Sequence, residues 1–315
     1  MALHHLEPAR ATLHGRFSRE LPPALTIDPG DTVILRTLQA GWALGPRPVE
    51  APATPPPRFA PRDPTRDDGH ALSGPIAIRG AEPGMALGVR IDDLRPGTWG
   101  MTFAGGWPSA VNDRLGIAAE PETVLIWELD PAALVGRDQF GHRLPLRPFL
   151  GVLGLPPAEP GWHPTPPPRH CGGNIDCKEL VAGSTLYLPI TVPGALFSVG
   201  DGHARQGDGE VSQTAIECPM DRVELTFTLH PDLHLRTPRA ETEEGWLTFG
   251  FHADLDEAML IALEAMIELI EGSYRLPRGQ AVALASLVVD LRITQVVNGV
   301  LGVHAVLPHG ALGAG

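Results

Sequence analysis

Glycine and proline constrain this chain more than any other feature. The sequence contains 36 glycines and 34 prolines among its 315 residues. Glycine costs a helix conformational entropy and proline removes a backbone donor, so this density breaks long helices and favours short strands joined by turns. Two proline-rich segments, Pro46–Pro64 and Pro156–Pro168, predict extended surface loops. The chain is therefore predicted to be mainly β.

Short apolar or alternating runs, bounded by Gly, Pro or Asp, predict the strands up to residue 230. The run Arg222–Leu229 alternates most clearly, which places one face on a core and the other face in water. The predicted strands are Ala24–Ile27, Thr32–Thr37, Ile76–Ile78, Ala86–Leu94, Thr123–Leu129, Thr185–Thr191, Glu210–Glu217 and Arg222–Leu229.

Helical signals come only near the end of the chain, where acidic residues open an apolar run and a proline opens a second one. An Asn-Gly pair between two apolar runs then predicts a tight hairpin. The predicted elements are a helix from Asp254 to near Gly272, a helix over Pro277–Leu287, and strands Val288–Val296 and Val300–Leu307 around Asn298-Gly299.

This order of elements predicts a mainly β (α+β) fold. The expected architecture is a jelly-roll-like β-sandwich body with an α+β C-terminal portion. We predict a β-sandwich domain over residues 1–230 that carries most of the functional site. Residues 231–315 would form the C-terminal portion of two helices and a hairpin.

Charge excludes several kinds of partner. The chain has 37 acidic and 24 basic residues, a net charge of −13, and Lys178 as its one lysine. Without a basic block, nucleic-acid binding is not expected, and an acidic surface repels anionic membranes. No apolar stretch is long enough to cross a membrane, and the first ten residues lack a signal-peptide pattern. We therefore expect a cytoplasmic protein.

The three cysteines, Cys171, Cys177 and Cys218, are too few for a disulfide scaffold, and their number is odd. Their spacing does not match a thiolate zinc site. All three lie next to polar loops, so we expect small buried residues that line a packed site. The alternative is a nucleophilic cysteine.

The stretch Gly200–Glu217 concentrates acidic side chains and an imidazole among glycines, and a second polar loop, Gly172–Asp176, precedes it. Such loops suit a metal site or a hydrolytic centre, because glycine lets the backbone turn tightly around it. The alternative is a pair of solvated turns, since Gly and Asp are also what turns prefer.

Asp201 and His203 are the first predicted metal ligands. Residues two apart in an extended segment point to the same face, so both side chains can reach one ion. Asp176, which follows a Gly-Gly-Asn turn, is the predicted third ligand. The alternatives are a hydrogen-bonded loop histidine at 203 and a turn cap at 176.

These loops resemble those of the acetamidase/formamidase family, and the resemblance covers nearly the whole chain. It implies a jelly-roll-like sandwich with an α+β part and hydrolysis of short-chain amides to a carboxylate and ammonia, often in a homodimer, with a divalent metal at the site. The matching segments are Gly172–Asp176, Ser184–Pro189, Val192–Phe197, Gly200–Glu210, His70–Pro75, Gly80–Gly84, Pro29–Thr32 and Gln295–Val300.

Amide hydrolysis at neutral pH needs an activated water and a stabilised oxyanion, and Zn²⁺ supplies both, so zinc is the expected cofactor. Glu217 and Glu210 are the candidate general bases. Because they lie seven positions apart in one predicted strand, the two side chains would face opposite sides of it. The apolar neighbours of Glu217 predict a partly buried carboxylate with a raised pKa, which favours Glu217 as the base. Asn174 would donate a hydrogen bond to the substrate carbonyl or oxyanion, or hold its own loop.

Three further residues are predicted in the pocket: His70 from the N-terminal half, Gln206 to orient a substrate amide, and Cys171, which stands where many relatives carry histidine. Arg36 and Gln39 stand where relatives commonly carry acids. The substrate's charge preference would then differ from that of these relatives.

Three functions follow. The leading one is a metal-dependent hydrolase for a formamide- or acetamide-like substrate. The second is an amidohydrolase for a larger or charged amide whose acidic group Arg36 would receive. The third is a non-catalytic sandwich that binds Ca²⁺ through Asp208 and Glu210 or presents a carbohydrate. Serine catalysis is weaker, because no GxSxG elbow occurs and Lys178 has no Ser-Ser-Lys context.

Overall fold

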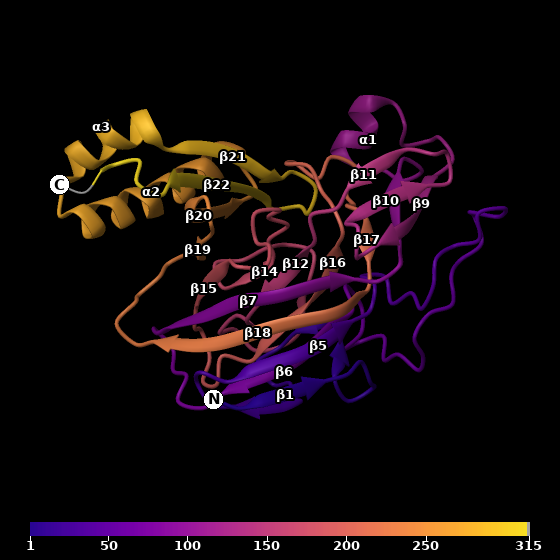
Figure 1. The fold of residues 1–315 in the computed structure, drawn as a ribbon, viewed down its shortest axis with the longest axis horizontal. Coiled ribbons are helices and arrows are strands. Elements are labelled where there is room, and N and C mark those ends of the chain that lie inside the picture. Colours follow the sequence, from indigo (N-terminus) through magenta and orange to yellow (C-terminus); the bar gives the residue numbers. More distant parts are fainter. Residues whose placement is uncertain (314–315) are drawn as a thin grey trace.

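The structure is a computed structural model that describes residues 1–313. Strands dominate it, and they form two large sheets and one two-stranded sheet (Figure 1). The small sheet pairs β3 (Arg16–Phe17) with β13 (His163–Pro164). The prediction of a mainly β chain is therefore confirmed.

The first sheet has nine strands and joins the two ends of the described chain. Its N-terminal strands lie at one edge and its C-terminal strands at the other. In order across the sheet they are β1 (Leu3–Leu6), β5 (Thr32–Thr37), β18 (Met220–His230), β7 (Ala86–Pro96), β15 (Thr185–Pro189), β19 (Arg239–Glu241), β20 (Gly245–His252), β22 (Leu301–Pro308) and β21 (Asp290–Gln295).

The second sheet has eleven strands and carries the polar loops singled out above. Three of its strands, β6, β2 and β4, branch from the main path beside β16. The strands are β11 (Arg143–Pro145), β10 (Val135–Asp138), β9 (Thr123–Asp130), β8 (Trp99–Ala104), β17 (Glu217–Cys218), β16 (Phe197–His203), β12 (Phe149–Gly154), β14 (Gly172–Asn174), β6 (Leu72–Ile78), β2 (Leu13–His14) and β4 (Leu25–Ile27).

One apolar core contains buried side chains from both large sheets. On β18, Val223, Leu225 and Phe227 are fully buried while the residues between them are partly exposed, as the alternation predicted. On β6 every residue is buried, since the strand lies inside the fold. Phe197 of β16 meets Phe227 edge to face, with ring centroids 5.3 Å apart.

The helices are α1 (Ala110–Leu115), α2 (Leu255–Tyr274) and α3 (Arg278–Val288). Asp254 caps the N-terminus of helix α2, and its side chain accepts hydrogen bonds from the backbone N–H groups of Asp256 and Glu257. It packs on β20 and β22 over a second apolar core. A Cβ at Gly250 would lie 1.9 Å from the carbonyl oxygen of Ala258, so only glycine allows this close approach of strand and helix.

The structure places strands at all but one of the predicted ranges before residue 230, and helices and a hairpin close to the predicted C-terminal ranges. The strand predicted over Glu210–Glu217 is wrong: only its last residue, Glu217, is in a strand, and residues 211–213 form a turn. The nine-stranded sheet runs across the predicted boundary at 230/231. The division into two parts stays a prediction, and residues 314–315 lie outside the described range.

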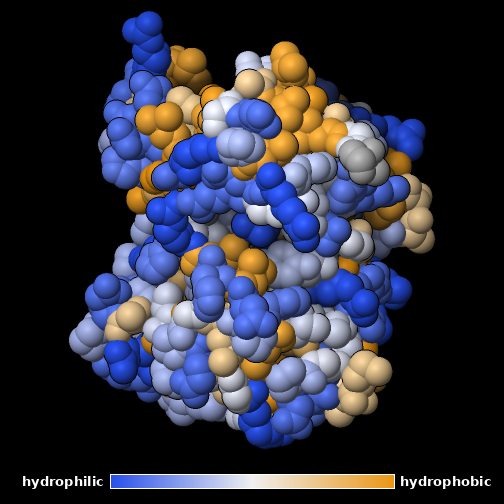
Figure 2. All heavy atoms as spheres, turned by 90° about the vertical axis from the view of Figure 1, so that its left-hand side faces the viewer, coloured by the Kyte–Doolittle hydropathy of each residue, from blue (hydrophilic) through white to orange (hydrophobic). Residues whose placement is uncertain are grey.

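Figure 2 shows the face at the C-terminal end of the molecule, where apolar side chains gather over the helices. Leu260 of α2 and Val282 and Leu287 of α3 are exposed. Within residues 1–313, no helix combines the length and the apolar character that a membrane crossing requires.

Candidate active site and metal centre

The polar loops meet at one buried centre. His203 ends β16 next to Glu217 of β17, its partner in the strand register, and Asp201 lies two residues earlier on β16. The loop after β14 brings Asp176, and the loop after β16 brings Glu210. All five side chains are buried.

His203 lies in the middle of this centre. Its Nε2 atom is 3.3 Å from Asp201 Oδ1 and 3.2 Å from Glu217 Oε1. The ligand atoms of Asp176, His203 and Glu210 lie within 4.8 Å of one another, and so do those of Asp201, His203 and Glu217. Two overlapping sets of possible metal ligands therefore share one imidazole.

Gln206 fixes the orientation of this imidazole. Its Nε2 donates to the backbone carbonyl of Asp176 at 2.8 Å, so its Oε1 is left as an acceptor. That oxygen lies 2.9 Å from His203 Nδ1, which therefore carries the proton. His203 Nε2 is consequently directed, unprotonated in the neutral ring, at the carboxylates, as in metal-binding histidines.

Strained backbone supports this arrangement. Asp176, Asp201 and Glu210 have positive φ angles of 54°, 59° and 46°. Such conformations cost a non-glycine residue on the order of 1–3 kcal/mol each and persist only where the surrounding structure enforces them. The three carboxylates are thus held in place by packing rather than by local preference.

Four buried carboxylates lie around His203, and burial and their mutual charges shift their pKa values. Burial raises the pKa of Asp176 to about 7, and burial together with the charge of Asp176 raises that of Glu210. Burial would also raise the pKa of Asp201, but the neighbouring His203 charge lowers it overall. Burial disfavours a charged His203, yet Glu217 and Asp201 outweigh it and raise the histidine pKa.

The donor set fits a divalent metal. Asp176 Oδ1, Asp201 Oδ1 and His203 Nε2 are buried and accept or donate no hydrogen bond within the described chain. Buried polar atoms normally have hydrogen-bond partners, so three atoms without one, all in ligand groups that include His203, indicate a bound group. Within residues 1–313, no lysine or arginine forms an ion pair with these carboxylates. One histidine with carboxylates is a ligand set that zinc accepts.

A cavity of about 300 Å³ opens onto this centre. Asp201, Glu210 and Glu217 line it, so both candidate bases reach it, contrary to the expectation that they face opposite sides. The turn between the two glutamates removes the strand geometry on which that expectation rested. The other lining residues are Gln39, Ala40, Gly41, Gly69, His70, Phe103, Pro166, Asn174, Gln213, Thr214 and Asn298.

Two of the predicted pocket residues face this cavity. His70 lies at its wall, where Thr165 Oγ1 contacts both its backbone N–H at 3.0 Å and its Nδ1 at 2.8 Å. Asn174 also lines the cavity, and its buried Oδ1 has no hydrogen-bond partner within the described residues.

Other predicted residues lie elsewhere. Cys171 is not at the cavity: its thiol points into the apolar core and donates to the carbonyl of Leu155, and burial raises its pKa to about 11. Gln206 holds His203 rather than lining the cavity. Arg36 is exposed on β5 and pairs with Asp221 at 3.3 Å, so it receives no substrate group here.

The calcium site with Asp208 and Glu210 stays a prediction, and the two side chains have different surroundings. Asp208 pairs with Lys178, with Oδ2 and Nζ 2.7 Å apart, while Glu210 turns to the cavity. Among residues 1–313, no group of potential ligands combines Asp208 with Glu210.

Sequence reasoning missed Asn298. Its Nδ2 donates to Asp176 Oδ2 at 2.6 Å, across 122 positions of sequence. The sequence predicts only a turn at Asn298-Gly299. The one signal of another role is that Gln295–Val300 is among the segments that carry the family resemblance. Sequence reasoning also missed Gly151 on β12, where a Cβ would lie within 3 Å of Asp201, Asp176 and His203. A lone glycine in a strand gives no signal of such a role.

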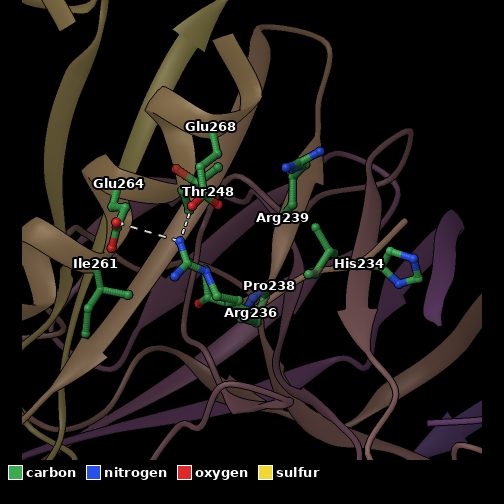
Figure 3. A pocket seen from close by; sticks show the side chains of 11 residues that line it. His234, Arg236, Pro238, Arg239, Thr248, Ile261, Glu264 and Glu268 are labelled. Carbon is green, nitrogen blue, oxygen red and sulfur yellow. Dashed lines mark hydrogen bonds and ion pairs between the residues drawn. The ribbon is translucent and has the colours of Figure 1, made fainter. Parts of the chain in front are cut away.

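A second buried cluster and a second hollow lie apart from this centre. Cys177, Glu179 and His304 meet in the interior, where Arg292 contacts Glu179 at 3.4 Å. The hollow, of about 200 Å³, lies between the 234–239 segment and α2, and Figure 3 shows Arg236 there, paired with Glu264 and Glu268. No group of potential metal ligands lies among its described lining residues.

Comparison with known proteins places the chain among amide-hydrolase relatives. A sequence model of the acetamidase/formamidase family matches residues 3–163 and 158–309. A formamidase-related protein of Schizosaccharomyces pombe is 32% identical over 251 residues, which are 64% of this chain and 60% of that protein. The chain spans about 60% of the length of the curated relatives that it matches.

Solved structures resemble the whole fold. A predicted acetamidase/formamidase of Thermoanaerobacter tengcongensis superposes with a TM-score of 0.83 at 27% identity, over 99% of this chain and 98% of that one. The acetamidase of Yersinia enterocolitica gives a TM-score of 0.83 at 28% identity, over 99% of this chain and 93% of that one.

Proposed function

The chain belongs to the acetamidase/formamidase family, and from this membership and its buried centre we propose that it is a metal-dependent amidohydrolase. It would convert a linear primary amide into a carboxylate and ammonia. One observation carries the proposal: His203 Nε2, Asp201 Oδ1 and Asp176 Oδ1 are buried without a hydrogen-bond partner within the described chain. His203 belongs to two groups of possible ligands, one with Asp176 and Glu210 and the other with Asp201 and Glu217.

We assign the metal to His203, Asp201 and Asp176, with zinc as the expected ion. A zinc ion held by these residues would supply Lewis-acid chemistry, which activates water at neutral pH and polarises a carbonyl. Gln206 keeps His203 Nε2 available, and Asn298 orients Asp176. Such outer contacts fix the direction of a ligand and its basicity.

Glu217 and Glu210 are the candidates for proton transfer. Both line the cavity, so either carboxylate is able to take a proton from the attacking water and return it to the leaving nitrogen, which departs as ammonia. Glu217 is the more tightly held, because its Oε1 accepts a hydrogen bond from the backbone N–H of Ala215 at 2.9 Å. Glu210 lies on a loop. Amide hydrolysis by the variants Glu210→Gln and Glu217→Gln would show which of the two carboxylates transfers the proton.

Asn174 and His70 would orient the substrate. The unpartnered Oδ1 of Asn174 is an acceptor for the amide –NH₂ group, which differs from the donor role expected from the sequence. His70 lines the cavity and would contact the carbonyl end of the substrate.

The test is ammonia release from formamide, acetamide and propionamide, before and after removal of metal with a chelator and after addition of Zn²⁺. We expect release that chelation abolishes and zinc restores, and a loss of at least about 100-fold in His203→Ala. The exposed His5→Ala serves as the matched control and should be unaffected. Release that survives complete metal removal would rule out the metal-dependent mechanism.

The family resemblance also predicts a homodimer and a cytoplasmic location. Light scattering on the purified protein would test the first, because a monomer at micromolar concentration contradicts it. Fractionation of the source cell would test the second.

A further inference from the structure

A second hollow continues the catalytic cavity. It measures about 290 Å³, against about 300 Å³ for the cavity at the carboxylate centre. The two share four lining residues, Gln39, Gly41, Phe103 and Thr214, so they form one continuous cleft. Pockets of such combined size hold ligands far larger than acetamide, since a single water occupies only about 30 Å³.

The second hollow has an apolar wall. Met101 and Phe103 of β8 lie along it, with Trp107, Ala43 and Pro56 beside them. The indole Nε1 of Trp107 donates to Gln213, which itself lines the first cavity. An aliphatic or aromatic acyl chain would therefore leave water for apolar surface as it passes from the first hollow into the second.

The far end of the cleft is cationic. Arg47 is already engaged: its Nη1 lies 2.5 Å from Glu122 Oε2, and its guanidinium stacks 4.9 Å from the Phe103 ring centroid. Arg58 also lines this end, and within residues 1–313 it forms no ion pair. Arg58 is thus the charge available to a ligand.

The charges at the two ends have opposite signs. Four carboxylates surround one end, where the proposed metal would bind, and an unpaired guanidinium stands at the other. Guanidinium is the side chain best suited to bind a carboxylate, through two parallel hydrogen bonds.

We propose that the substrate of this site is a linear primary amide whose acyl chain is apolar, longer than that of acetamide, and ends in a carboxylate that Arg58 binds. The inference rests on the amidohydrolase function proposed above and specifies its substrate class. Thr214 and Phe103 line both hollows and flank the acyl chain. Arg36, to which the sequence assigned this role, lies outside the cleft.

The test compares three amides on the zinc-loaded protein: acetamide, the unbranched six-carbon amide, and the monoamide of the six-carbon dicarboxylic acid. We expect kcat/KM to rise in that order. The advantage of the carboxylated amide over the neutral one of equal length should shrink as salt increases, because salt screens exposed charge pairs.

Two variants assign the effect to Arg58. Arg58→Ala should lower kcat/KM for the carboxylated amide about fivefold and leave acetamide unchanged. Arg62→Ala is the matched control, since Arg62 lies on the same loop, over the Trp42 ring and outside the cleft, and should change neither. Arg58 is exposed, so its replacement should not disturb folding.

Binding of the carboxylated amide, measured by calorimetry, separates the two proposals. Binding that weakens in Arg58→Ala without any ammonia release would support the cleft assignment and reject the hydrolase function. Hydrolysis of all three amides with equal kcat/KM, or equal loss for all three in Arg58→Ala, would overturn the substrate class and leave the hydrolase function intact.

Discussion

At the residue scale, the centre depends on the absence of a side chain at Gly151. A Cβ there would lie 2.5 Å from Asp201 Oδ2, 2.7 Å from Asp176 Oδ1 and 2.9 Å from His203 Cε1. No real Cβ makes contacts this short with fixed neighbours. The three proposed ligands therefore approach one another over the bare backbone of β12.

Gly151→Ala should displace these ligands while the fold survives, because overpacking one methyl group costs typically about 1–3 kcal/mol. We expect a loss of bound zinc and a drop in kcat/KM of about 100-fold. Metal content after dialysis and amide hydrolysis are the measurements. Gly207→Ala is the control, since Gly207 lies on the neighbouring loop with open space around it. Normal zinc content in Gly151→Ala would contradict the ligand assignment.

At the scale of elements, the segment between β16 and β17 decides which carboxylates reach the cavity. Its composition allowed a strand, but Gln213 N–H bonds back to the carbonyl of Glu210 at 2.9 Å, and Ser212 Oγ donates to the carbonyl of Thr214 at 3.1 Å. Local side-chain and turn hydrogen bonds of this kind compete with strand pairing. The turn exposes Val211 and directs Glu210 inward.

The loop between β21 and β22 reaches the same centre from the other sheet. Asn298→Ala would remove the 2.6 Å hydrogen bond to Asp176 and free that carboxylate to rotate. Loss of such an outer contact typically costs about 10–100-fold in metal affinity or activity. Zinc titration with a competing chelator measures the effect. Val297→Ala keeps the loop's backbone hydrogen bonds and should leave affinity unchanged; equal affinity in the two variants would contradict the role of Asn298.

At the scale of the whole molecule, the C-terminal strands are part of the first sheet rather than an appendage. Strand β19 pairs with β15, and β20, β22 and β21 extend the sheet from there. The shared apolar core takes four buried residues from beyond position 230: Ala240, Leu247, Phe249 and Val306.

A chain cut after residue 230 should therefore fail to fold cooperatively, since it loses these core residues and leaves the edge of β15 unpaired. It also loses Asn298. Urea unfolding followed by circular dichroism, with the full chain as reference, tests this expectation. A cooperative transition of the fragment would instead support the two-part division predicted from the sequence.

The sequence alone determined the parts of this protein whose signals are local. Alternation in Arg222–Leu229 and the late apolar runs located strands and helices, because side-chain periodicity depends only on neighbours in the chain. The crowding of acids around His203 marked the loop that carries the centre, and the family resemblance supplied the amide chemistry.

Only the tertiary structure decided which side chains meet. Asp176 and Asn298 are 122 positions apart, and Arg58 reaches the cleft from a proline-rich loop that the sequence marked only as extended. Cys171, next to the Gly172–Asp176 loop, turns into the core instead. Contacts of this kind depend on how distant strands pair and how closely backbones approach, as at Gly151, and neither is encoded in any single stretch of the chain.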